Sequence, residues 1–132
     1  MSDDKNNCVF CGVANGGAVT PVRYEDDEMI AVDNIEPATP IHVLVIPKKH
    51  ISSLATVEEG DQLLLGKLIY RAKLLAEELN IAETGYRVSI NVGKWGGQIM
   101  PHLHIHLLGG APLSTHLREF LTEAELPQVA TE

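Results

Sequence analysis

The sequence of 132 residues is short of aromatic side chains, which make up 5% of it, and of basic side chains. It has 10 Lys and Arg against 18 Asp and Glu, which gives a formal net charge of −8. Because proteins bind duplex nucleic acid largely by neutralising its phosphates with Lys and Arg, this balance argues against a nucleic-acid partner. The same charge repels small phosphate esters, so a phosphate pocket here must be built locally from backbone N–H groups and histidines.

Long apolar runs are also missing. No run approaches the ~20 residues that a membrane-spanning helix needs, so we expect no membrane partner. The N-terminus, MSDDKNNC, has neither the basic start nor the apolar stretch of a signal peptide, which favours a cytoplasmic location. The chain has no internal repeat and no low-complexity linker. We therefore expect one domain over 1–132, with 1–7 and 127–132 disordered.

The spacing of the apolar residues predicts an α+β domain. Strands are expected at 21–25, 28–34, 41–47 and 85–93, and along the histidine-rich run at 98–110. Several strands with one long helix inserted between them favour α+β architecture over alternating βαβ units.

Two helices are expected. The segment 61–80 carries Leu at helical spacing with charged residues opposite, which is typical of one amphipathic helix. Thr56 and Glu59 have the spacing of a capping box at its start, and Asn80 suits a left-handed C-terminal residue. A second helix is expected over 114–126.

Three of the six histidines lie in the short run HLHIHLL. Residues two apart on a strand share a face, so His102, His104 and His106 are expected to point the same way, with apolar residues pointing the other way. Ser, Thr, Lys or Glu would serve a merely solvated face equally well. Neutral imidazole is both a nucleophile and a zinc ligand. The run is therefore interpreted either as an open catalytic metal site or as a nucleophile flanked by helper histidines.

The two cysteines, Cys8 and Cys11, form the sequence CVFC. In a reducing compartment the pair is a redox motif, half of a metal site, or two buried small side chains. Together with His50 and His102 it would make a closed, structural Cys2His2 zinc site. We favour this interpretation, which leaves the other two histidines of the run for phosphate chemistry.

The pattern HLHIHLL resembles the signature of the histidine triad (HIT) superfamily of nucleotidyl hydrolases and transferases, with IHVLVIPKKH and NVGKWGGQ at the expected distances upstream. HLLGG and IPKKH are similar to the HINT branch, and CVFC resembles its zinc-containing bacterial type. The resemblance extends from about Cys8 to Gly110. It implies a homodimer whose α+β protomers share one continuous antiparallel sheet of the HIT fold. It also implies binding of purine nucleotides such as AMP or GMP and cleavage at the α-phosphorus.

By motif position, the resemblance implies that His104 is the nucleophile, His106 a phosphate contact and His42 a supporting histidine. It also implies that His50 and His102 are zinc ligands beside the two cysteines. Further matches are the ribose-binding pair and the Gly-rich loop. These positions are Asn34 and Ile35 for the ribose, and Gly97 and Gln98 for the loop, whose backbone N–H groups would hold phosphate oxygens.

Other side chains are candidates from their positions alone. Asn91, before the Gly-rich loop, is a hydrogen-bonding candidate, although Asn often caps a turn. Phe10, Val32 and Leu44 are candidates for an apolar base pocket and equally for ordinary core. Trp95, in the loop, is interpreted either as a base-stacking residue or as a subunit contact.

The sequence departs from the family pattern at two of these positions. Asn34 stands where the family commonly has Asp, and Ile99 stands where the HINT branch often has Ser or Thr. We therefore expect a hydrolase of adenosine 5′-phosphoramidates or related AMP conjugates that acts through a nucleotidyl-histidine intermediate. The alternatives are a dinucleoside polyphosphate hydrolase, a nucleotide-binding adaptor with vestigial catalysis, and a zinc hydrolase.

Overall fold

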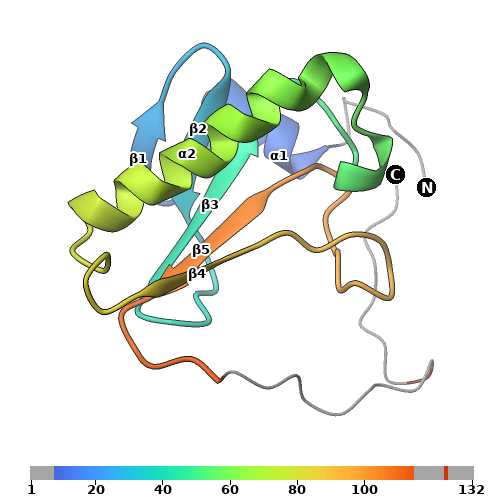
Figure 1. The fold of residues 1–132 in the computed structure, drawn as a ribbon. Helices are drawn as coiled ribbons and strands as arrows, with labels where there is room; N and C mark the ends of the chain where they lie inside the picture. Colours follow the sequence, from blue (N-terminus) through green and yellow to red (C-terminus); the bar gives the residue numbers. More distant parts are fainter. Residues whose placement is uncertain (1–7, 115–123, 125–132) are drawn as a thin grey trace.

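The computed structural model describes residues 8–114 and residue 124. Five strands form one antiparallel sheet in the order β1-β2-β3-β5-β4, which confirms the predicted α+β class (Figure 1). The strands are β1 Val22–Glu25, β2 Met29–Asp33, β3 Ile41–Pro47, β4 Tyr86–Ser89 and β5 Ile105–Gly109. The β4 strand is shorter than the predicted 85–93. Because β3 is the central strand and pairs with β5, the side chains of these two strands lie in the middle of the sheet.

The histidine run is less of a strand than its alternation predicts. β5 begins at Ile105, so among the three histidines His106 alone lies in a strand. The backbone N–H of His102 donates to the Met100 carbonyl over 2.9 Å within a turn, which removes it from the sheet ladder. The prediction of a strand over 98–110 is therefore wrong for its first half.

The long helix α2 spans Gln62–Glu78 and lies across one face of the sheet (Figure 1). It confirms the helix predicted over 61–80. Asn80 follows the helix with a φ of 61°, the left-handed conformation expected there.

The predicted capping box between Thr56 and Glu59 is wrong. Two single helical turns precede α2, η3 at Leu54–Thr56 and η4 at Glu59–Asp61, and each has its own cap. Thr56 pairs reciprocally with Ser53, and Asp61 pairs with Glu58. Two separate helical turns thus precede α2, and in each of them a capping box supplies acceptors for backbone N–H groups at its start.

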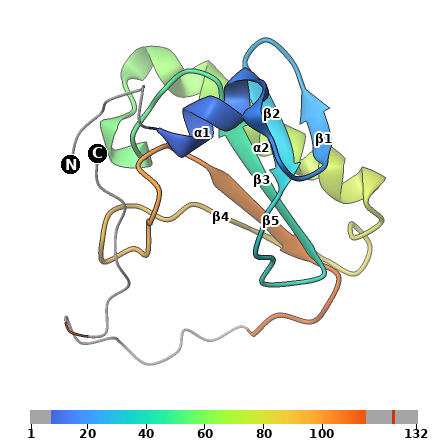
Figure 2. The same cartoon turned by 180° about the vertical axis from the view of Figure 1, so that it is seen from behind.

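A short helical segment that the periodicity did not predict covers the opposite face of the sheet (Figure 2). It consists of α1, Val9–Gly12, and a wider turn, η2, Val13–Gly17. The Cys8 side chain caps α1 by accepting from the Cys11 N–H over 3.3 Å. CVFC is therefore the first turn of this segment.

Each face of the sheet has its own apolar cluster. The α2 cluster lies under the long helix, and its buried members include Val43, Val45, Leu68, Leu75, Leu103, Ile105 and Leu107. The α1 cluster is smaller and consists of Ala14, Ile30, Val32, Leu44 and Ile46, with Phe10, Val13 and Ala18 packed against it. The apolar residues between the histidines thus belong to the α2 face, and this confirms the alternation predicted for the run.

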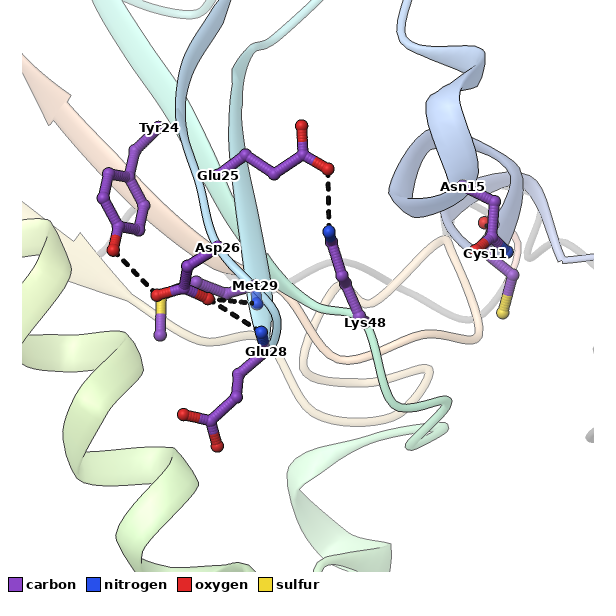
Figure 3. A network of polar contacts seen from close by, with 8 residues as sticks. All are labelled: Cys11, Asn15, Tyr24, Glu25, Asp26, Glu28, Met29 and Lys48. Atoms are coloured by element: carbon purple, nitrogen blue, oxygen red, sulfur yellow. Dashed lines mark hydrogen bonds and ion pairs between the residues drawn. The ribbon is translucent and has the colours of Figure 1, made fainter.

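The turn between β1 and β2 is fixed by one carboxylate (Figure 3). Asp26 accepts the backbone N–H groups of Glu28 and Met29 and the hydroxyl of Tyr24. Lys48, just after β3, pairs with Glu25 over 2.7 Å. These contacts join the β1–β2 hairpin to the central strand.

The helix predicted over 114–126 falls largely outside the described residues, as do the segments 1–7 and 127–132. Within the described part of the chain, no helix has the length and apolar character needed to cross a bilayer.

Candidate nucleotide site and metal site

A cavity of about 440 Å³ opens beside α1 on the face of the sheet opposite α2. It gathers side chains from the N-terminal segment, β2, β3, the Gly-rich loop and the histidine run. Nine of the sequence-predicted residues line it: Phe10, Val32, Asn34, Ile35, Leu44, Asn91, Gly97, His104 and His106. None of the described lining residues is Lys or Arg, while Asp33 and Glu36 are acidic. Any phosphate in this cavity must therefore be held by neutral donors.

A hydrogen bond fixes the tautomer of the His104 ring. Its Nδ1 lies 2.8 Å from the carbonyl oxygen of His102. Because a carbonyl accepts and cannot donate, Nδ1 carries the hydrogen and Nε2 keeps its lone pair. Burial lowers the pKa of His104 below its ordinary value, so the ring is neutral at pH 7. The tautomer and charge suit a nucleophile.

His42 and His106 form a directed hydrogen-bond relay. The backbone N–H of Ala38 donates to His42 Nδ1 over 3.0 Å, so the hydrogen of the neutral His42 ring is on Nε2. That Nε2 lies 2.9 Å from His106 Nδ1, which must accept. His106 then carries its own hydrogen on Nε2, a buried atom with no partner among the described residues.

Both relay histidines are neutral. Burial, followed by the neighbouring rings of His104 and His42, lowers the pKa of His106 to about 4. Burial and then His104 also lower the pKa of His42. His42 does not line the cavity itself, and acts on it through His106.

Asn34, which stands where the family commonly has Asp, has contacts in the structure that show what this difference changes. Its Oδ1 accepts the Glu36 N–H over 2.9 Å, and its Nδ2 lies 3.2 Å from His42 Nε2. Since the relay places a hydrogen on that Nε2, two donors face each other there. An Asp at this position would instead offer an acceptor.

The Gly-rich loop is closed by its own hydrogen bonds. The side chain of Gln98 accepts from the Gly93 N–H and donates to the carbonyls of Ser52 and Met100. The Gly97 N–H donates to the Lys94 carbonyl. Gln98 is therefore not a lining residue of the cavity, and its side chain holds the loop in place.

Trp95, in the same loop, is 80% exposed. Ile99 does line the cavity, with its side chain partly exposed at the mouth.

The predicted metal ligands meet at the start of α1. Cys8 Sγ lies 3.1 Å from His102 Nδ1, and Cys11 Sγ lies 3.2 Å from His50 Nδ1 and 3.5 Å from His102 Nδ1. All four ligand atoms lie within 4.8 Å of one another. Ligand atoms 2.0–2.3 Å from a tetrahedral zinc ion are themselves roughly 3.3–3.8 Å apart. Within the described residues, no other His, Cys, Asp and Glu side chains form such a group.

The tautomers of this tetrad also fit a metal. His102 Nε2 lies 2.9 Å from the Pro47 carbonyl, which can only accept, so Nδ1 directs a lone pair toward the sulfurs. Burial lowers the pKa of His102 to about 4, which keeps the ring neutral. Because His102 belongs to this closed tetrad, the histidine run does not form an open metal site of its own.

The main residues that sequence reasoning missed come from α1, η2 and the segment that follows them up to Thr20. Val9, Val13, Ala18, Val19 and Thr20 line the cavity, together with Met100 from the histidine run. The spacing of four between Val9 and Val13, and between Phe10 and Ala14, is a helical signal that was available in the sequence.

Comparison with known proteins gives consistent matches. A family model described as the HIT domain matches residues 17–113. Protein HitA of Neisseria gonorrhoeae is 41% identical over 104 residues, which cover 79% of this chain and 96% of that protein. The crystal structure of a HIT family hydrolase from Legionella pneumophila has a TM-score of 0.80 at 42% identity, covering 83% of this chain and 97% of that one. A zinc-bound histidine triad family protein from Mycobacterium smegmatis has a TM-score of 0.71 at 31% identity, covering 85% and 83%.

Proposed function

Because the chain belongs to the HIT domain family, we propose that it is a purine nucleotide-binding hydrolase that cleaves adenosine 5′-phosphoramidates or related AMP conjugates at the α-phosphorus. One observation carries the proposal. A nucleophile and a hydrogen-bond donor, His104 Nε2 and His106 Nε2–H, belong to rings that line one cavity. Together they supply what an in-line attack on a phosphate ester needs.

The reaction has two displacements. The Nε2 lone pair of His104 attacks the α-phosphorus, and the P–N bond breaks with its electron pair leaving on the amine, which takes up a proton. Water then attacks the nucleotidyl-histidine, the bond to Nε2 breaks, and AMP is released with loss of a proton to solvent. His106 Nε2–H donates to a nonbridging phosphate oxygen as charge develops in each step. Splitting one difficult displacement into two lowers each barrier.

The nucleotide lies with its base against the apolar wall and its sugar near β2. Phe10, Val32 and Leu44 form the apolar wall, and Asn34 and Ile35 contact the ribose. Asn91 and the backbone around Gly97 lie on the phosphate side. The acidic side chains of Asp33 and Glu36 contribute no phosphate binding, and the Gly97 N–H already donates within its own loop. Phosphate binding therefore falls to His106 and Asn91.

Zinc at the Cys8, Cys11, His50 and His102 tetrad has a structural role in this proposal. When bound, it would cross-link α1 to the region after β3 and to the histidine run. The Mycobacterium smegmatis relative is described as zinc-bound, which supports zinc as the metal.

We also propose that two protomers join through β4 to continue the sheet. The β1 strand has an irregular register against β2 between Val22 and Tyr24, and it carries the charged side chains of Arg23 and Glu25, features that disfavour pairing with a further strand. The β4 edge exposes Tyr86 and Val88, and so favours pairing. Light scattering is expected to give the mass of a dimer for the native protein, and a monomer for Val88→Lys.

Ile99 sets the clearest limit on the substrate. It offers no hydroxyl at the cavity mouth for the leaving group, so turnover of polar leaving groups relies on solvent for the proton. If turnover is absent while AMP binds tightly, the protein is a nucleotide-binding adaptor, an alternative motivated by Ile99 and Asn34. A panel of phosphoramidate, aminoacyl-adenylate and dinucleoside polyphosphate substrates separates these functions.

The test of the enzymatic function is AMP release from adenosine 5′-phosphoramidate. We expect turnover by the wild type and a loss of at least about a thousandfold in His104→Ala. His116→Ala is the matched control, because His116 lies outside every motif. Turnover that survives in His104→Ala contradicts the mechanism.

A further inference from the structure

Phe10 lies between two cysteines of the metal tetrad and also lines the nucleotide cavity. Its ring packs edge-on against two imidazoles, with centroids 6.1 Å from His102 and 5.0 Å from His104. One of these imidazoles is a predicted metal ligand, and the other is the predicted nucleophile. The same side chain therefore touches both sites.

His102 provides a second link between the sites. Its ring faces the two sulfurs, and its backbone carbonyl accepts the Nδ1–H of His104 over 2.8 Å. The ring is fully buried, so its position is determined by these partners and by Pro47. A shift of His102 toward or away from a metal ion therefore changes the position of both the Phe10 ring and the nucleophile.

The α1 helix that carries Phe10 has little intrinsic stability. It has 4 residues, far fewer than an isolated helix needs in water. Its attachment to the sheet consists of the α1 cluster and of the contacts that the two sulfurs make with His50 and His102. A metal ion bound to Cys8 and Cys11 would add a further attachment of α1, and with it of the Phe10 ring, to the sheet.

We propose that Phe10 is a positioning residue that couples the metal tetrad to the nucleotide site, so that nucleotide binding and metal coordination alter each other. The inference rests on the proposed function, because it requires AMP to bind in the cavity. Coupling between two binding sites is reciprocal by thermodynamic necessity. The metal centre can therefore report on the nucleotide, even though the nucleotide does not touch it.

The experiment replaces zinc with cobalt(II), whose visible absorption depends on the geometry of the Cys2His2 ligand set. AMP is titrated into the folded, cobalt-loaded wild type while calorimetry follows its binding. We expect the visible band to shift, and the shift to saturate at the AMP concentration at which the heat of binding saturates. An unchanged band at saturating AMP overturns the inference. Absence of any heat of binding contradicts the proposed function itself, and the two failures are thus distinguishable.

Phe10→Leu tests the assignment of the coupling to this ring. The variant keeps all four ligands and an apolar side chain, and we expect AMP to shift its cobalt band by less than about half the wild-type amount. Leu63→Ala is the matched control, since Leu63 is an exposed side chain on α2 that belongs neither to the cavity lining nor to the tetrad. It is expected to retain the full shift. A full shift in Phe10→Leu, measured at saturating AMP, overturns the assignment.

A second measurement follows from reciprocity. Zinc-loaded protein is expected to bind AMP about five- to fiftyfold more tightly than stripped protein, and AMP to tighten zinc by the same factor. Equal AMP affinities in the two folded forms overturn the coupling. If the stripped protein does not fold, the cobalt spectra decide the question alone.

Discussion

The two faces of the sheet are covered in different ways. On one face the 17 residues of α2 pack over a continuous apolar cluster, whose members at Leu68 and Ile105 are fully buried. On the other face, a short helix and one wider turn cover a cluster of five buried residues and leave a cavity beside it. The first face is closed by hydrophobic burial, with the Lys67–Glu28 ion pair and the Arg71–Tyr24 cation–π contact joining α2 to the β1–β2 hairpin. The second contains the histidines, the cysteines and the cavity.

This difference shows where the domain can accommodate chemistry. A face with enough apolar area needs no other attachment, because burial contributes about 25 cal/mol for each Å² removed from water. A segment with too little apolar area to hold itself down can be fixed by metal ligands, and it leaves space for a ligand. We therefore expect perturbations of the α1 face to affect metal and nucleotide binding, and perturbations of the α2 face to affect global stability.

The largest expected effect is the loss of one metal ligand. Cys8→Ser keeps an oxygen that can cap α1 but replaces the thiolate, and we expect zinc affinity to fall at least about a hundredfold. Hydrogen exchange is expected to accelerate in residues 8–18 while α2 stays protected. Equal acceleration of hydrogen exchange in α2 would show that the two faces of the sheet do not respond independently, and would contradict the account.

The next effect concerns the apolar clusters. Leu68→Ala removes a fully buried side chain from the α2 cluster and is expected to lower the free energy of unfolding by about 2–5 kcal/mol. Val13→Ala, on the cavity side, is expected to cost less than about 1 kcal/mol, since part of its side chain already faces space. Urea denaturation of both zinc-loaded variants measures the difference. Similar losses of unfolding free energy in the two variants would contradict the claim that the α2 face is tightly packed and the α1 face is open.

A smaller effect is expected from pH. The pKa of His106 is lowered to about 4 in the folded protein, whereas an unfolded histidine titrates near 6.5. Between these values the unfolded state binds more protons, so stability falls as pH decreases from about 6.5 toward 4. In His106→Gln this decline is expected to be shallower. Parallel pH profiles for the wild type and the variant, measured by chemical denaturation, would contradict the neutral relay.

The smallest expected effect is at Asn34. Asn34→Asp replaces the donor that faces His42 with an acceptor for the relay and for ribose hydroxyls, and we expect AMP to bind about three- to tenfold more tightly. Asn91→Asp is the control, because it adds the same charge to the same cavity without the His42 contact. It is expected to weaken AMP binding by repulsion. Calorimetry that finds equal changes in both variants would contradict the role of the relay.

Features of the fold and of the site could be predicted from the sequence where a residue pattern had a single physical explanation. The HIT fold is confirmed, and the four residues predicted as metal ligands lie close enough together to hold a metal ion. The long helix was predictable because its apolar period is unbroken, and Asn80 because few residues tolerate a left-handed conformation. The cavity also contains most of the predicted nucleotide-site residues.

The remaining features depend on tertiary contacts that a local pattern does not contain. His102 leaves the strand because its N–H turns back to Met100, and the HLHIHLL alternation reads the same in a strand or an extended turn. The α1 helix is too short for periodicity to dominate, and metal ligands help to hold it. Gln98 matched a loop motif, but its side-chain partners at Ser52 lie far away in sequence.

The central claim is that His104 Nε2 becomes bonded to the α-phosphorus, and the most direct measurement is to trap that bond. Wild-type protein is mixed with excess adenosine 5′-phosphoramidate, quenched within milliseconds in alkaline denaturant and examined by peptide mass spectrometry. The account predicts an adenylyl group on His104, formed and lost at rates consistent with turnover. Turnover without a histidine adduct, or with the adduct on His106 alone, would contradict it.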